Sequence, residues 1–213
     1  MTLETKRVAR RAKEGEAKPT TQRMTKRPPK RVSPSYLKNV AMHYLEQRSS
    51  SRANLRRLLV RRVTLSLAEH GGERDELLGW VDALLDELER MHLLDDATYA
   101  AQRVRSLSRM GNGSRKIRAK LAEKGVPAPL VDAALVQVQD SGPSLDLVAA
   151  CRFARSRKLG PYRRDAETVQ DRDERQKQLA KLARAGFSYE IAIRVIDCES
   201  RDIIDEIVSS SQF

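Results

Sequence analysis

From residue 33 onward, apolar side chains recur every three or four positions along the chain, with charged residues between them. This spacing is typical of amphipathic helices, in which an apolar stripe faces a core. Turn and capping residues separate one stripe from the next. Ser33-Pro34, Ser51 and Asp95 suit helix starts, and Gly125 suits the left-handed end of a helix. The pattern therefore predicts an all-α protein made of successive short helices.

One apolar motif appears twice at the same place in this pattern. WVDALL begins at Trp80 and LVDAAL begins at Leu130, and each follows another helix and a turn. A third copy, IAIRVI at 191–196, follows KLARAGF at 181–187, which matches KLAEKGV at 120–126. Because amphipathic helices often share Leu, Ala and Val, one such match would mean little. Three ordered sets with matching glycine-containing turns predict three tandem units of three helices each.

A unit of roughly fifty to sixty residues buries little apolar surface alone, so the units are expected to stack. The predicted fold is an all-α, elongated and curved array of three tandem three-helix repeats. We place repeat 1 at 33–92 with an insert at 64–75, repeat 2 at 93–140, and repeat 3 at 144–209 with a charged insert at 163–176.

Composition agrees with thin helical layers, because the chain is 40% hydrophobic but only 4% aromatic and 33% charged. Its two cysteines, Cys151 and Cys198, fall in apolar helical patterns, so we expect buried, reduced thiols. No apolar run approaches the ~18 residues that a membrane helix needs, and the start of the chain lacks the apolar stretch of a secretory signal. We therefore expect a cytoplasmic protein without membrane association.

The positive charge is concentrated at one end of the chain. Of the formal net charge of +12, residues 1–32 contribute eleven Lys or Arg against three Glu, a net of +8. This segment has prolines and no apolar periodicity, so it cannot bury enough surface to offset its chain entropy. We predict a disordered basic tail. Such a tail is typical of proteins that bind a polyanion, although it also promotes general solubility.

No motif indicates catalysis or a bound metal. His43, His70 and His92 lie more than twenty residues apart, without the close spacing of metal-ligand pairs. The segment GNGS at 111–114 could hold a phosphate at a helix start, but it lacks the length and lysine of a P-loop and is better explained as a turn. The aspartates at 95–96 are better explained by helix capping than by a catalytic carboxylate pair. We expect a protein that is not an enzyme and needs no cofactor.

Basic residues recur on the first and second helices of the predicted units. Several lie three or four positions apart, so they can share one helix face. A single arginine is usually only solvated, but repetition in every unit favours a charged stripe. Such a stripe suits a phosphate backbone or an acidic protein groove, and the lack of interleaved aromatic residues argues against base-specific binding. The candidate binding residues are Arg52, Arg56, Arg57, Arg61, Arg103, Arg105, Arg109, Arg115, Lys116, Arg118, Lys120, Arg152 and Arg155.

Three segments, AMHYLEQRSSSRANLRRLL, LLDDATYAAQRVRS and GNGSRKIRAKLAEKGV, resemble the bacterial RecX family, whose members regulate the RecA recombinase. The resemblance covers residues 36–198, and its most specific parts are Leu-Asp-Asp-x-x-Tyr-Ala at 94–100 and Gly-x-x-x-Ile-x-x-x-Leu-x-x-x-Gly-Val at 113–126. It implies tandem three-helix repeats and a non-enzymatic protein that binds RecA and its filaments on single-stranded DNA. It also implies modulation, usually inhibition, of strand exchange and ATP hydrolysis in recombination, DNA repair and the SOS response.

The family has no shared catalytic residues, so the candidate binding residues rest on charge alone. The basic tail and the inserts at 64–75 and 163–176 depart from the family pattern. We expect a monomer that contacts RecA, with additional phosphate contacts to single- or double-stranded DNA. Two alternatives stay open: a sequence-nonspecific nucleic-acid-binding helical module, and a helical adaptor for another acidic partner.

Overall fold

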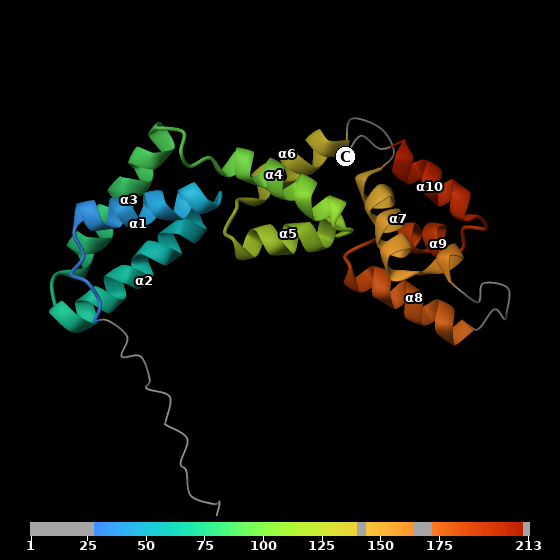
Figure 1. The fold of residues 1–213 in the computed structure, drawn as a ribbon, viewed down its shortest axis with the longest axis horizontal. Coiled ribbons are helices and arrows are strands. Elements are labelled where there is room, and N and C mark those ends of the chain that lie inside the picture. The colour runs from blue at the N-terminus through green and yellow to red at the C-terminus, as the bar shows by residue number, and fades with distance from the viewer. Residues whose placement is uncertain (1–27, 140–143, 164–171, 211–213) are drawn as a thin grey trace, which may run out of the picture.

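The computed structural model describes residues 28–139, 144–163 and 172–210 of the 213-residue chain. Within these ranges the regular elements are ten α-helices and one short 3-10 helix, η1. They form three groups that follow one another along an arc (Figure 1). The all-α, elongated and curved array of helical repeats predicted from the apolar spacing is therefore confirmed.

Repeat 1 contains two helices that begin at serine caps. Ser33 Oγ accepts a hydrogen bond from the backbone N of Tyr36, and Ser51 Oγ accepts one from the backbone N of Asn54, each at 3.2 Å. Each bond satisfies an amide that the start of a helix leaves unpaired, as predicted. The helices of this repeat are α1 (Pro34–Gln47), α2 (Arg52–His70) and α3 (Arg74–Arg90).

The limits of repeat 1 differ from those drawn on the sequence in two places. Residues 64–70, placed in an insert, continue α2. Val32, placed in the tail, is only 5% exposed and packs in the core of this repeat. Its backbone N donates to Ser66 Oγ at 3.0 Å, which fixes this part of the chain on α2. Residues 28–31 of the predicted tail are also described, whereas residues 1–27 lie outside the described residues.

Repeat 2 follows the predicted order of helices and turns. Asp95 caps its first helix, because its Oδ1 accepts hydrogen bonds from the backbone N of Ala97 and of Thr98 at 2.9 and 3.1 Å. Hydrogen bonds from Thr98 also hold the pKa of Asp95 below its ordinary value. Gly125 ends the second helix with φ +75°, a conformation that only glycine adopts without steric cost. The helices are α4 (Asp96–Arg109), α5 (Ser114–Glu123) and α6 (Ala128–Gln139).

Repeat 3 contains one α-helix more than predicted. The additional helix, α10, packs against α7 and buries Ile204. Tyr162 Oη, in η1, also holds α10 in place by donating to Asp205 Oδ1 at 2.6 Å. Of the predicted charged insert, residues 164–171 lie outside the described residues, and its last residues begin α8. The elements are α7 (Leu145–Arg157), η1 (Gly160–Tyr162), α8 (Arg172–Arg184), α9 (Tyr189–Ile196) and α10 (Arg201–Ser209).

The two cysteines lie in different environments. Cys151 is buried on α7, and burial raises the pKa of its thiol to about 11, so the thiol stays protonated at neutral pH. Cys198 is half-buried in the link between α9 and α10, where its Sγ donates to the carbonyl oxygen of Ser200 at 3.4 Å. Both are free thiols, as predicted, but the prediction of a buried position on a helix is wrong for Cys198.

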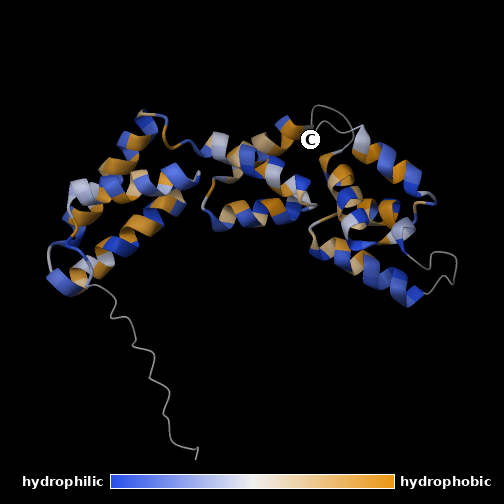
Figure 2. Cartoon of the chain, viewed as in Figure 1, coloured by the Kyte–Doolittle hydropathy of each residue, from blue (hydrophilic) through white to orange (hydrophobic). Residues whose placement is uncertain are grey.

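Each repeat has its own apolar core, formed where the helices of one group face one another (Figure 2). The first residues of a following repeat help to complete the core before it. Leu94 precedes α4 yet packs in the core of repeat 1, and Leu145 begins α7 yet packs in the core of repeat 2. Neighbouring repeats therefore cannot separate without exposing apolar surface to water.

Both junctions between repeats use an aspartate on the first helix of one repeat to cap the second helix of the repeat before it. At the repeat 1–2 junction, the backbone N of Arg52 donates to Asp96 Oδ1 at 2.8 Å. At the repeat 2–3 junction, the backbone N and Oγ of Ser114 donate to the two carboxylate oxygens of Asp146 at 2.8 and 2.7 Å. Each aspartate lies in the first turn of the first helix of its repeat, so the two occupy equivalent positions.

At each junction, a backbone carbonyl in the turn that follows the second helix of the later repeat accepts a further hydrogen bond. At the repeat 1–2 junction, Ser51 Oγ donates to the carbonyl oxygen of Lys124. At the repeat 2–3 junction, the backbone N of Gly113 donates to the carbonyl oxygen of Ala185 at 2.9 Å. Because equivalent positions meet at both junctions, each repeat is added with a similar rotation, and the array curves. The second helices α2, α5 and α8 lie along the concave edge (Figure 1).

Replacing Asp146 by alanine is expected to lower the free energy of unfolding by about 1–2 kcal/mol, because it removes the acceptor for two donors at the start of α5. Asp146→Asn is the matched control, since its remaining oxygen can still accept one of these bonds and its loss should be smaller. Urea unfolding followed by circular dichroism measures both. Equal losses in the two variants would contradict a capping role for this side chain.

Candidate binding surface

Two of the candidate arginines hold together helices of their own repeat. Arg56 Nε donates to Asp82 Oδ1 at 2.7 Å, and Arg118 Nε donates to Asp132 Oδ1 at 2.8 Å. Both pairs join the second helix of a repeat to its third. The two arginines are equivalent positions, as are the two aspartates of WVDALL and LVDAAL. The hydrogen bond from Arg56 also holds the pKa of Asp82 below its ordinary value. The positive charge of each of these two arginines is therefore balanced by an aspartate of the same repeat.

Arg52 and Arg155 are also paired with acidic residues. Arg52 binds both Asp86, at 2.7 Å, and Glu89 on α3. Partial burial lowers the pKa of Arg52, but hydrogen bonding to Asp86 and the negative charge of Glu89 outweigh it, so the net shift is upward. Arg155 lies 3.5 Å from Asp205 and joins α7 to α10. The positive charges of Arg52 and Arg155 therefore serve ion pairs between helices of the same repeat.

Five candidates on α2 and α5 keep an uncompensated positive charge. Two of them donate to neutral groups: Arg57 to the carbonyl oxygen of Glu123 at 2.6 Å, and Lys120 to Asn112 Oδ1 at 3.3 Å. The other three have no ion-pair or hydrogen-bond partner among the residues that the structure describes. We name this set the concave basic surface, because its members lie on two helices of the concave edge; they are Arg57, Arg61, Arg115, Lys116 and Lys120.

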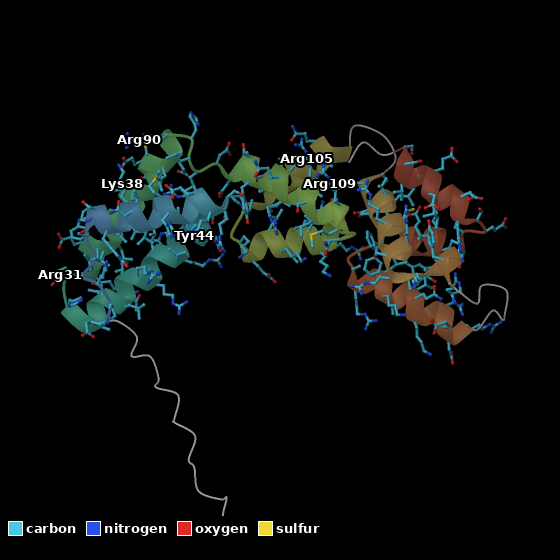
Figure 3. The ribbon with its side chains drawn as sticks, viewed as in Figure 1. Arg31, Lys38, Tyr44, Arg90, Arg105 and Arg109 are labelled. Carbon is cyan, nitrogen blue, oxygen red and sulfur yellow. The ribbon has the colours of Figure 1, made fainter. Side chains whose placement is uncertain are left out.

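The remaining candidates lie on the first helices, away from the concave edge. Figure 3 shows Arg105 and Arg109 on the side of α4 that faces away from α5. Arg152 lies on α7, where burial and the positive charge of Arg109 lower its pKa. Arg103 is half-buried beside Tyr99. The structure thus separates the predicted stripe into two basic areas on different sides of the array.

A groove that the charge pattern does not reveal adjoins the concave basic surface. It has a volume of about 600 Å³ and lies between α2 and the turn at Gly125, at the repeat 1–2 junction. Its lining includes the aliphatic residue Leu65, which is 43% exposed. Leu65 lies outside the apolar stripe of α2 that contains Leu59 and Val63. An apolar residue outside that stripe is the one sign of the groove in the sequence.

Within the described part of the chain, no helix has both the length and the apolar character needed to cross a membrane. The same residues contain no group of three or more His, Cys, Asp or Glu side chains placed to hold a metal ion.

Stacked three-helix units with a concave basic edge define a helical-repeat protein, a class whose extended surfaces bind other macromolecules. Residues 95–135 match the family model described as RecX, second three-helix domain. The chain is 44% identical over 170 residues to regulatory protein RecX of Myxococcus xanthus strain DK1622, an alignment that covers 79% of this chain and 88% of that protein. The chain belongs to the RecX family of regulatory proteins.

Further comparisons agree with this assignment. The regulatory protein RecX of Agrobacterium fabrum strain C58 is 33% identical over 175 residues, which cover 81% of this chain and 89% of that protein. The crystal structure of RecX from Lactobacillus salivarius aligns with a TM-score of 0.57 at 20% identity, over 83% of this chain and 96% of that chain. A crystal structure of regulatory protein RecX aligns with a TM-score of 0.55 at 23% identity, over 78% and 72% of the two chains. These two structures share the fold.

Proposed function

We propose that the protein binds the RecA recombinase, including its filament on single-stranded DNA, and lowers its ATP hydrolysis and strand exchange. Membership of the RecX family carries the proposal. The uncompensated charges of the concave basic surface support it, because they lie on two successive repeats of a curved array. Such an array can contact more than one subunit of a filament at once, and positive charge favours contact with acidic protein surface or DNA phosphate.

The experiment measures RecA ATP hydrolysis on single-stranded DNA while the full-length protein is titrated in. We expect the rate to fall as the protein approaches the concentration of RecA. An unchanged rate at equimolar protein would contradict the proposal. A version lacking residues 1–27 tests the basic tail separately. The truncation stops there because Val32 packs against the repeat 1 core.

The variant Arg61→Glu/Arg115→Glu tests the concave basic surface. It should weaken inhibition, because both side chains are exposed and lack partners among the described residues. Its matched control is Arg74→Glu/Arg90→Glu, which makes the same charge change at two exposed positions on α3. Equal inhibition by the two double variants would assign the activity to another surface.

A sequence-nonspecific nucleic-acid-binding module is the second candidate function, since the same unpaired charges suit phosphates. Such binding weakens with salt, with a log–log slope of about −0.7 per contacted phosphate on single strands. A steep salt dependence of DNA binding, together with an unchanged RecA ATPase rate, would favour this alternative.

A further inference from the structure

The groove at the repeat 1–2 junction presents an apolar floor beside positive charge. Its aliphatic lining residues are Ala53, Val60 and Leu65, which we call the floor, and Arg57 and Arg61 also line it. The two arginines lie four positions apart on α2, so their side chains are neighbours on one helix face. Such a surface is complementary to a partner that offers an apolar side chain beside negative charge.

The charges at the groove differ in what they can bind. Arg56 is neutralised by Asp82, to which it donates from Nε and Nη2 at 2.7 and 3.1 Å. Arg57 donates one bond to the Glu123 carbonyl, which positions its guanidinium while leaving its charge unpaired. Arg61 has no ion-pair or hydrogen-bond partner in the described part of the chain. The groove therefore offers two positive charges, one of them held in place.

The chemistry of the groove selects among possible occupants. Phosphates could meet Arg57 and Arg61, but the floor is aliphatic, and no aromatic side chain lines the groove for a base to stack on. The chain's own segment 1–27 carries nine Lys or Arg against three Glu, so it would be repelled. An acidic peptide with an apolar side chain between its carboxylates satisfies both the floor and the charges.

We propose that this groove binds an acidic segment of a protein partner, with an apolar side chain placed on Leu65 and Val60 and carboxylates paired with Arg57 and Arg61. The inference rests on the proposed function only because it takes the partner to be a protein. Because the groove adjoins the turn at Gly125, a bound segment touches both repeat 1 and repeat 2. Occupancy therefore also fixes the angle between these repeats.

The test uses the full-length protein and a fluorescein-labelled peptide in which one leucine is flanked by two glutamates on each side. Fluorescence anisotropy measures binding at up to about 1 mM peptide, the weak end of specific recognition. Two control peptides replace the glutamates by glutamine or the leucine by serine. We expect saturable binding of the first peptide, and at least about tenfold weaker binding of either control. No saturation, or equal binding of all three, overturns the proposal.

Two variants test whether the peptide binds in the groove. Arg61→Glu and Leu65→Ser should each weaken binding about five- to tenfold. Their matched controls are Arg74→Glu, an exposed arginine on α3, and Met91→Ser, whose side chain is 45% exposed compared with 43% for Leu65. The controls should bind as the unaltered protein does. If they lose as much affinity as the groove variants, the peptide binds elsewhere and the proposal fails.

Three further outcomes separate this inference from its alternatives. If single-stranded oligothymidylate binds with the same dependence on Arg61 and Leu65, the groove takes nucleic acid and the proposal is overturned. If the protein inhibits RecA but the peptide does not bind, the groove inference fails while the proposed function stands. If the peptide binds in the groove but RecA is unaffected, the inference stands and the proposed function fails.

Discussion

Gly186→Ala is expected to lower the free energy of unfolding by about 2–4 kcal/mol and to detach repeat 3 from repeat 2. Gly186 has φ +94°, which costs a residue with a side chain about 1–2 kcal/mol. The added methyl would also lie 2.6 Å from the backbone N of Lys116 at the start of α5. The chain cannot simply shift away, because the Gly113–Ala185 hydrogen bond fixes the same turn. Crowding of this kind costs a further 1–3 kcal/mol, roughly.

Urea and thermal unfolding followed by circular dichroism measure this effect. Because stacked repeats unfold cooperatively only while their junctions hold, we also expect a separate early transition for repeat 3. Gly79→Ala is the matched control: Gly79 lies inside α3, and a methyl there would meet no atom within 4 Å. That change should stabilise the protein by about 0.5–1 kcal/mol. Similar destabilisation by both changes would refute the close backbone contact as the cause.

Leu121→Ala is expected to destabilise the protein by about 2–5 kcal/mol. Leu121 is 1% exposed and lies in the core of repeat 2. The change leaves a cavity in the central repeat, which supports both junctions, so neither outer repeat can compensate. Many domains are stable by only about 5–15 kcal/mol, so this loss is a large share of the total.

Urea titration of Leu121→Ala should show a lower midpoint. The control is Val136→Ala on α6 of the same repeat, whose side chain is 58% exposed, and its effect should stay within about 0.5 kcal/mol. A loss below about 1 kcal/mol for Leu121→Ala would mean that the core of repeat 2 closes around the missing side chain, contrary to expectation.

The helical array could be predicted because its signals are local. Caps such as Ser33, Ser51 and Asp95 lie within three residues of the amides they bind, and apolar spacing marks each helix directly. The additional helix α10 lies within the predicted bounds of repeat 3, 144–209, but was missed because the motif match to the other repeats stops at Ile196. Ser200 and the apolar residues that follow it carry the same signals that identified the other helices.

The binding surface could be predicted only in part, because sequence shows where charge is but not what faces it. Arg56 and its acidic partner are 26 residues apart, and Arg118 and its partner are 14 apart. No local pattern distinguishes these paired arginines from Arg61 and Arg115, which have no partner among the described residues. The groove also depends on distant residues, since residues of α2 and Gly125, which follows Leu65 by sixty residues, line it together.

The junctions have a consequence for how this shape persists through evolution. Part of the contact between repeats is made by main-chain atoms, as in the Gly113–Ala185 hydrogen bond and the approach of Gly186 to the backbone of Lys116. Main-chain atoms are the same in every residue, so most surface side chains can change without altering the bend of the array. Divergent sequences can thus keep one curvature while their surfaces adapt to different partners, provided that a few small residues and capping acids stay in place.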